Sequence, residues 1–320
     1  MGFFKKRDIG IDLGNYKTII VERGNESPLF EECIHPRNAN PPYVDGLFGQ
    51  FGYTRTLEKK SELSDYLTYA IGKACSGKRL VRPRVLIAVP LCISDRERQV
   101  IIKSCKSTGV GFVNLVPSLM MAAIGAGLPV SEPDCQSLVL DIGAHTSEFS
   151  AFSVAGMKEA ESFPWGGAQL THVILEYFKT CHSMTLTVET AENLKKAIQL
   201  KPCYESLFDV SGWIDGRPHQ VIKVTNKGLC SVLQESLMSF RSSIAKKLRN
   251  FTNRPDGNYE IVLSGGGALL QGLDQCLSEE LNVVCKVVTD PQRAVSRGLA
   301  LAREMDVLVQ TETECTAIEL

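Results

Sequence analysis

Hydrophobic residues along this chain follow two patterns, one typical of strands and one typical of helices. The run Val85-Leu86-Ile87-Ala88-Val89 is continuously apolar and ends at Pro90, as expected of a strand buried on both faces. Residues 57–76 instead carry apolar side chains on one helical face. These are Leu63, Leu67, Ala70, Ile71 and Ala74. Because strands and helices alternate in this way, the pattern predicts an α/β protein with parallel or mixed sheets.

The same two patterns predict the remaining elements. Strands are expected in the two halves of 9–21, at 112–116, in the two halves of 138–150, and at 204–210, 219–224, 261–263 and 283–288. Helices are expected from Ser94 to Ser107, after 116 through Gly127, at 167–181, 190–199 and 226–251, from Ala268, and at 291–305. Ser94 and Glu97 have the spacing of a capping box. Residues 27–56, rich in Pro, Gly and Asn, predict a small appendage or long loop, and the polar tail 310–320 is expected to fray.

Two strand–turn–strand segments of the chain repeat each other. In the first, a buried strand carries Asp12 and turns at Gly14; in the second, the strand carries Asp141 and turns at Gly143. Backbone N–H groups of such turns can cradle phosphate, and the aspartates can hold a hydrated divalent cation. Two such loops that face each other would clamp a nucleotide between two similar half-molecules.

A third glycine-rich turn supports the same interpretation. Ser264-Gly265-Gly266-Gly267 lies between a predicted strand and a predicted helix. Glycines let a ligand approach the backbone closely, and the start of a helix favours phosphate or a purine edge. Alone, the cluster could be only a tight turn. In order with the two aspartate loops, it favours a nucleotide site.

Composition excludes several classes of protein. The 320 residues are enough for two domains, and the net charge of −1 with a pI near 6.5 argues against a nucleic-acid binder. The first eight residues lack the apolar core of a signal peptide, and no run approaches the roughly 20 residues of a membrane span. The 11 cysteines form no Cys-x-x-Cys pair. We expect a cytoplasmic protein in which Cys92, Cys105, Cys230 and Cys285 are reduced and buried.

A stretch that superficially looks like a phosphate-binding P-loop is excluded. Residues 72–79 place Arg79 where a P-loop needs Ser or Thr to bind Mg²⁺. The stretch also ends a predicted helix instead of following a strand.

Together, these segments resemble the actin-like ATPase superfamily and, within it, the MreB family of bacterial actins. The matching segments are 9–18, 82–90, 94–98, 121–133, 138–148, 190–195, 263–274 and 290–300. The resemblance implies an actin-like fold of two duplicated ribonuclease-H-like domains flanking a nucleotide cleft. It implies a first domain at 1–135, with a reduced small subdomain at 27–56 and a completing helix at 300–312. The second domain would span 136–299, with a small subdomain at about 171–228.

The resemblance also implies a role for each matching residue in binding ATP and Mg²⁺. Asp12 and Asp141 would hold the Mg²⁺ ion through water. The phosphates would be wrapped by Gly14, Asn15, Tyr16 and Lys17 and by Gly143, Ala144, His145 and Thr146. The nucleoside would be bordered by Glu192, Lys195, Gly265, Gly266, Gly267, Ala268 and Leu269. Two alternatives stay open, since Glu192 and Lys195 could be a solvated helix pair and His145 could simply be packed.

The chain departs from the family pattern at the expected catalytic position. MreB proteins carry two glutamates, one of which organises the attacking water, where this chain has Pro117-Ser118. Ala144 and His145 replace two loop glycines and can crowd a triphosphate, whereas Lys17 can add charge against the β- and γ-phosphates. Because positioning and charge supply most phosphoryl-transfer catalysis, we expect slow or absent ATPase activity with nucleotide binding retained. The catalytic residues therefore stay unassigned.

Partners and location follow from the resemblance and from two apolar-basic patches. The family implies self-assembly into filaments, and contact with cell-shape or wall-synthesis proteins. Phe3 and Phe4 precede three basic residues, and Leu80 and Val81 lie among four. Such patches favour anionic membranes, so we expect peripheral binding at the inner membrane face.

Two other functions stay open. One is a non-polymerising nucleotide-dependent switch or scaffold, which the shortened appendage favours. The other is a small-molecule kinase or chaperone ATPase, against which no inserted substrate domain is seen. The residues are compatible with ATP or GTP.

Overall fold

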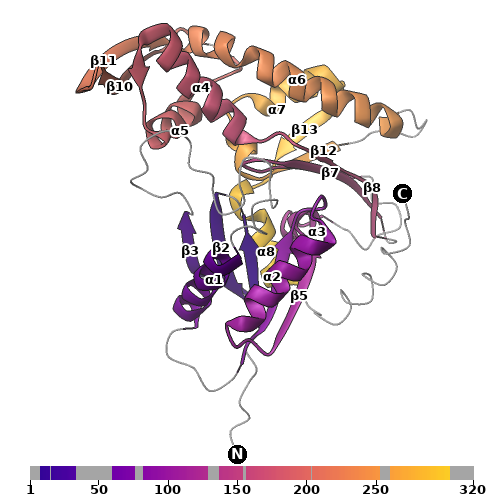
Figure 1. Cartoon of the computed structure of the whole chain (residues 1–320). Helices are drawn as coiled ribbons and strands as arrows, with labels where there is room; N and C mark the ends of the chain where they lie inside the picture. The colour runs from indigo at the N-terminus through magenta and orange to yellow at the C-terminus, as the bar shows by residue number, and fades with distance from the viewer. Residues whose placement is uncertain are drawn as a thin grey trace, which may run out of the picture.

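The computed structural model describes residues 8–14, 16–33, 60–75, 82–128, 137–153, 156–202, 204–252 and 260–302. Its strands build two large sheets and one small one (Figure 1). The first sheet contains β1 (Asp8–Leu13), β2 (Lys17–Glu22), β3 (Asn25–Cys33), β4 (Arg84–Val89) and β5 (Phe112–Pro117). The second contains β6 (Ser137–Ile142), β7 (Ser147–Ser153), β8 (Gly156–Phe163), β12 (Glu260–Ser264) and β13 (Val284–Val287).

The two large sheets have the same topology. The first has the order β3-β2-β1-β4-β5 and the second, read from its β8 edge, β8-β7-β6-β12-β13. In each, three consecutive strands pair antiparallel, and two further strands then add in parallel. The predicted duplication is thereby confirmed.

Helices cover both faces of the first sheet. Strand β4 alternates, with Val85, Ile87 and Val89 in one core and Leu86 and Ala88 in another. Helices α1 (Lys60–Ala74) and α2 (Asp95–Ser107) pack in the first core, and α3 (Ser118–Gly125) and α8 (Ala294–Leu301) in the second. The predicted continuous burial of this strand is therefore confirmed, as is the capping box of Ser94 and Glu97 that opens α2.

The second sheet has its own core and carries the small sheet. Leu138, Leu140 and Ile142 of β6 pack with α4 (Gly167–His182), α6 (Asn226–Thr252) and α7 (Leu273–Leu281). Beyond α4 follow β9 (Met184–Thr185), α5 (Val188–Ala197), β10 (Leu207–Ile214) and β11 (Arg217–Thr225). These three strands form a sheet of order β11-β10-β9.

The structure corrects several predictions made from the sequence. Residues 27–33 are not irregular, because β3 pairs with β2 at the edge of the sheet and Leu29 and Phe30 pack on its core. Pro28 is tolerated there since an edge strand needs fewer N–H donors. Strands β8 and β9 were not predicted. The helix expected from Ala268 is a 3-10 turn, η2 (Gly266–Leu269), and α7 starts later, after Gly272.

The expectations for the cysteines and for the final helix need correction, and some predicted segments lie outside the described residues. Cys105 and Cys285 are buried and Cys230 is partly buried, but Cys92 is exposed because it follows the end of β4 in a turn. The final helix begins with the 3-10 turn η3 (Pro291–Arg293) and α8 ends at Leu301. Residues 303–312, the proposed boundary at 135–136 and most of 27–56 lie outside the described residues.

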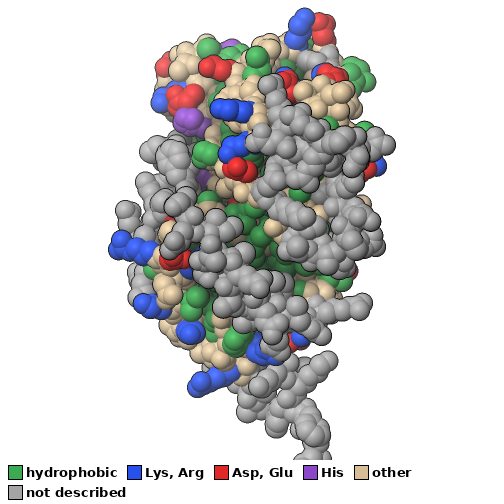
Figure 2. Space-filling model, turned by 90° about the vertical axis from the view of Figure 1, so that its right-hand side faces the viewer, with side chains coloured by type: hydrophobic (Ala, Val, Ile, Leu, Met, Phe, Trp, Pro, Cys, Tyr) green, Lys and Arg blue, Asp and Glu red, His purple; other side chains and the backbone are tan. Residues whose placement is uncertain are grey.

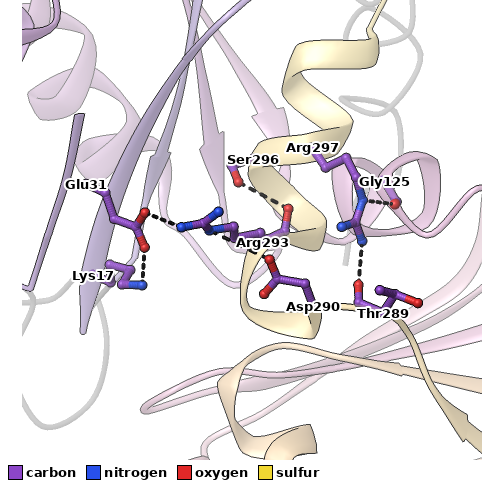
Figure 3. A network of polar contacts seen from close by, with 8 residues as sticks. All are labelled: Lys17, Glu31, Gly125, Thr289, Asp290, Arg293, Ser296 and Arg297. Atoms are coloured by element: carbon purple, nitrogen blue, oxygen red, sulfur yellow. Dashed lines mark hydrogen bonds and ion pairs between the residues drawn. The ribbon is translucent and has the colours of Figure 1, made fainter. Parts of the chain in front are cut away.

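Helices α3 and α8 cross at very close range. Since α3 follows the first sheet and α8 follows the second in the chain, this contact joins the two halves of the molecule. A Cβ atom on Gly125 would lie 1.9 Å from the carbonyl oxygen of Ala294, and one on Gly298 would lie 1.9 Å from that of Met121. Arg297 fastens the crossing by donating to Gly125 O at 2.5 Å and Thr289 O at 2.9 Å (Figure 3). Val139 and Phe152 of the second sheet pack on the same helices, so this layer lies between the sheets.

The described helices and one face of the surface bear on how the molecule could contact a membrane. None of the helices in the described ranges is both long and apolar enough to cross a bilayer. In the side view, acidic and basic side chains both occur on the upper and the lower half (Figure 2).

The crossing predicts a sharp difference between two glycine substitutions. Gly298→Ala should lower the free energy of unfolding by at least about 2 kcal/mol, because a backbone carbonyl cannot move aside as a side-chain end can. Gly72→Ala on α1 meets open space and should raise it by up to about 1 kcal/mol. Denaturant unfolding followed by circular dichroism measures both values. Equal effects of the two substitutions would contradict this account of the crossing.

Candidate functional site

A cleft lies between the two sheets where the repeated loops face each other. Both loops, the glycine-rich turn after β12, the start of α4 and the second half of α5 contribute to its walls. The sequence-predicted residues that line it are Asp12, Gly14, Tyr16, Lys17, Asp141, Gly143, Ala144, His145, Thr146, Glu192, Lys195, Gly265, Gly266, Gly267 and Leu269. Ala268 is buried and is absent from the lining. Asn15 lies outside the described residues.

The two loops share one turn geometry, which explains their glycines. A Cβ on Gly14 would lie 2.8 Å from the carbonyl oxygen of Lys17, and one on Gly143 would lie 2.9 Å from that of Thr146. In both loops the chain therefore folds back on the residue three positions on. A side chain at either glycine would open the turn.

Helix α4 orients the second loop. The N–H groups of Gly167 and Ala168 donate to the carbonyls of Gly143 and Ala144 at 3.0 and 2.7 Å. Because a trans peptide is planar, the N–H groups of Ala144 and His145 point away from α4. Both residues line the cleft, and His145 is buried in its wall. Such outward N–H groups suit an anion.

Two aspartates place poorly compensated negative charge in the cleft. Burial, and next the repulsion from Asp141, raise the pKa of Asp12 to about 7, although Lys17 opposes the shift. Burial also raises the pKa of Asp141, against a hydrogen bond from the Ser264 hydroxyl. Paired carboxylates of this kind fit a divalent cation. Among the described residues no group of three or more His, Cys, Asp or Glu could hold a metal ion, so water and phosphate would have to complete its shell.

Glu192 and Lys195 are not a solvated helix pair. Their side chains are only 12% and 15% exposed and meet at 2.7 Å. Lys195 also donates to Thr171 Oγ1 at 2.8 Å and to Gly167 O at 3.0 Å, so the pair ties α5 to the start of α4. Burial lowers the pKa of Lys195. The open alternative from the sequence is thereby removed, and the pair stands in the cleft wall.

Lys17 is held by a carboxylate of the neighbouring strand. It pairs with Glu31 of β3, which also accepts a hydrogen bond from Arg293 at 2.6 Å (Figure 3). Since two cations share it, the pKa of Glu31 is lowered even though its partial burial opposes the shift. Arg293 belongs to η3, so this network connects the first sheet to the segment that enters α8 (Figure 3).

The arrangement of two duplicated sheets around a glycine-lined acidic cleft agrees with the comparisons to known proteins. The profile of the family described as MreB/Mbl protein matches residues 56–311. The chain belongs to the MreB/Mbl family.

Relatives cover almost the whole chain. The cell shape-determining protein MreB of Escherichia coli (strain K12) is 33% identical over an alignment of 335 positions, which spans 93% of each protein. The cell shape-determining protein Mbl of Bacillus subtilis (strain 168) is 27% identical and covers 91% of this chain and 94% of its own length.

Solved structures show that the fold is actin-like. MreB5 of Spiroplasma citri, crystallised with ADP, superposes with a TM-score of 0.77 at 20% identity, covering 97% of this chain and 99% of its own. MamK in a double helical filament superposes with a TM-score of 0.72 at 17% identity, covering 92% and 98%.

Within this MreB/Mbl fold, the glycines of the turn after β12 allow close packing and also leave room for a ligand. Gly265 has φ +80°, and a Cβ there would lie 2.3 Å from the carbonyl oxygen of Ile142. A Cβ on Gly267 would lie 2.2 Å from the Ile142 side chain, whereas Gly266 meets only the Gln292 side chain at 3.5 Å. Gly265 and Gly267 are therefore required by the turn itself. Gly266 is the position with room for a ligand.

Among the residues of the cleft wall that sequence reasoning missed, two have chemistry of their own. Trp165 lines the cleft, stacks on Phe240 with ring centres 3.7 Å apart, and donates to Ser236 Oγ. Glu148 of β7 also lines it, beside Ser118, and burial raises its pKa to about 7. The Glu148 position follows the repeated motif directly, so alignment of the two repeats would have drawn attention to it. Nothing in the sequence marks Trp165.

The buried carboxylate of Asp12 predicts how stability depends on pH. Its pKa is about 7 when folded against 3.8 ordinarily, so the folded protein keeps a proton that the unfolded chain has lost. Stability contributed by this group is therefore lost as pH rises from about 4 to about 7. Between pH 5 and pH 8, Asp12→Asn should gain roughly 1–3 kcal/mol over the parent in free energy of unfolding.

Urea unfolding at both pH values, without nucleotide, measures this gain. Asp65→Asn, which removes an exposed carboxyl of α1, is the matched control. An Asp12→Asn profile parallel to that of the parent would contradict the predicted burial cost.

Proposed function

We propose that this chain is a divergent MreB-like cytoskeletal protein that binds ATP with Mg²⁺ in the cleft. It assembles into filaments that direct cell shape or cell-wall synthesis. The observation that carries the proposal is the convergence of Asp12, Asp141 and Lys195 on one cleft between two duplicated glycine loops. Each feature alone also occurs in proteins that bind no nucleotide, but together they match a phosphate-bearing ligand that arrives with a cation.

The chemistry of the cleft supports a nucleoside triphosphate in particular. The outward N–H groups of the second loop and the Lys17 side chain suit phosphate. Mg²⁺, when bound, supplies charge neutralisation for both the phosphates and the aspartates. The Glu192–Lys195 pair and Gly266 lie in the wall where a nucleoside would extend. We expect slow hydrolysis, because Pro117 and Ser118 stand where the family carries glutamates.

Solved relatives support the nucleotide and the assembly. Spiroplasma citri MreB5 has been crystallised with ADP and with AMPPNP, and MamK forms a double helical filament. By extension, we propose self-association for this chain. Membrane attachment at the inner face rests on the sequence alone, through Phe3, Phe4, Leu80 and Val81, which lie outside the described residues.

Nucleotide binding is testable through intrinsic fluorescence. The chain has two tryptophans; Trp213 is 41% exposed on β10, so Trp213→Phe leaves Trp165 in the cleft wall as the reporter. ATP with Mg²⁺ should change its emission saturably. Lys195→Met should weaken binding about tenfold or more, since it removes a cation from the cleft wall and leaves the negative charge of Glu192 uncompensated there.

Glu189→Gln, an exposed change on the same helix, is the matched control and should bind ATP like the parent. Lack of any saturable response, confirmed by calorimetry, would exclude the cleft as a nucleotide site.

Assembly and membrane attachment can be separated in one sedimentation series. With ATP, the protein should pellet and show filaments by negative-stain microscopy. Vesicles containing anionic lipid should recruit these filaments, because apolar tips with basic neighbours bind such surfaces. Alanine replacement of Phe3, Phe4, Leu80 and Val81 should abolish recruitment but leave the filaments.

Three results would change the proposal in different ways. Recruitment that survives the alanine replacements would exclude these patches as the attachment. Filaments that ignore vesicles would exclude membrane attachment altogether. ATP binding without filaments would replace the cytoskeletal proposal with a non-polymerising switch or scaffold.

A further inference from the structure

Glu148 is a buried carboxylate in the cleft that the binding of a nucleotide does not explain. Its side chain is 2% exposed and lies in the cleft wall. The backbone N–H of Leu91 donates to one of its oxygens at 2.6 Å, and the Ser118 hydroxyl donates to the other at 2.9 Å. The carboxylate is therefore fixed by two segments of the first half of the molecule, the one after β4 and the start of α3.

The duplicated sheet shows that the fold itself does not need this acid. In the second sheet Asp141 pairs with Glu148 across β6 and β7, and in the first sheet Asp12 pairs with Ile19 across β1 and β2. Ile19 is 1% exposed, so the equivalent position holds an ordinary apolar side chain. Burying a carboxylate costs free energy that an isoleucine would not. Because only the second sheet carries a carboxylate at this position, Glu148 should have a chemical role.

The position of Glu148 supplies that reason. Ser118 is one of the two residues that stand in place of the family's glutamates, and its hydroxyl holds Glu148 directly. The carboxylate thus reaches, from the opposite sheet, the place where the missing group would act. It lies on the same face as Asp141, because directly paired residues share a face. Each oxygen accepts one hydrogen bond from the protein and keeps a lone pair for a water molecule.

We propose that Glu148 orients the attacking water for ATP hydrolysis, with Ser118 as the positioning residue that holds it. This rests on the nucleotide binding proposed above. The water oxygen forms the new bond to the terminal phosphorus, and the bridging P–O bond breaks with its electron pair leaving on ADP. Both protons of the water end on the released phosphate, one kept on the attacking oxygen and one passed to a phosphoryl oxygen, giving ADP and dihydrogen phosphate. Glu148 fixes the angle of approach, which Pro117 and Ser118 cannot do.

The central variant is Glu148→Gln in the full-length protein. The amide oxygen can still accept from Leu91 N–H, and the amide nitrogen can donate to the Ser118 hydroxyl, so the fold keeps both contacts. Phosphate release in a single turnover should fall about 10²-fold, because a misoriented nucleophile loses most of the benefit of positioning. The dissociation constant for ATP, read from Trp165 emission, should stay within about twofold of the parent value, since Glu148 acts on the water and not on the phosphates.

Three further variants separate positioning from structure. Ser118→Ala should slow release several-fold, again with unchanged ATP binding. Glu161→Gln, on β8 of the same sheet and paired with Lys247 outside the cleft, should release phosphate at the parent rate. Adding Ser118→Glu to Glu148→Gln returns a carboxylate to the cleft and should recover at least about tenfold of the lost rate. Recovery by a carboxylate on another element is not expected of a merely structural residue.

The outcomes are distinct. If the parent does not bind ATP, the proposed function fails and this inference with it. If the parent binds ATP, then either no phosphate release above the protein-free rate, or release by Glu148→Gln within threefold of the parent, overturns the role of Glu148 alone. Should Glu148→Gln unfold, Glu148→Ile, the residue of the equivalent position, replaces it and must show the same selective loss of turnover.

Discussion

The close crossing of α3 and α8 is the contact on which the site depends. Helix α8 follows the second sheet in the chain, yet it packs on the first, where Leu299 lies against Gly10. Gly125 and Gly298 allow the two helices to cross this closely, since a Cβ on either would lie 1.9 Å from a backbone carbonyl oxygen. Because the layer is shared by both sheets, the ends of β1 and β6 are held facing each other. The cleft is therefore a consequence of helix packing between the halves.

Electrostatics gives that cleft its chemistry. Asp12, Asp141 and Glu148 all face it from buried or partly buried positions, and their pKa values are raised. Lys17 and Lys195 are the cations in its wall whose partners the structure describes, and each is already paired with a glutamate. A site with this excess of negative charge favours a ligand that brings a cation. The stability of the protein and its occupancy are thereby linked.

Much of this architecture could be predicted from the sequence, for identifiable reasons. The duplicated loops, the capping box of Ser94 and the buried strand of β4 are local patterns with a strict period or spacing. Strand β3 could not be predicted, because Pro28 and the charged Glu31 and Glu32 mask its alternation. The contacts Ser118–Glu148 and Glu31–Arg293 join residues far apart in sequence. No local pattern encodes them, since they arise only when the two sheets are packed together.

The duplication has a further consequence for how a ligand lies in the cleft. A site built from two copies of one motif would, if the copies were identical, accept a ligand equally well in either of two orientations related by the pseudo-twofold axis. The copies differ at several equivalent positions, among them Lys17 against Thr146 and Ile19 against Glu148. One side therefore presents a cation and an apolar surface, and the other a hydroxyl and an acid. These differences make the two orientations of a ligand unequal, so the ligand should bind in one of them.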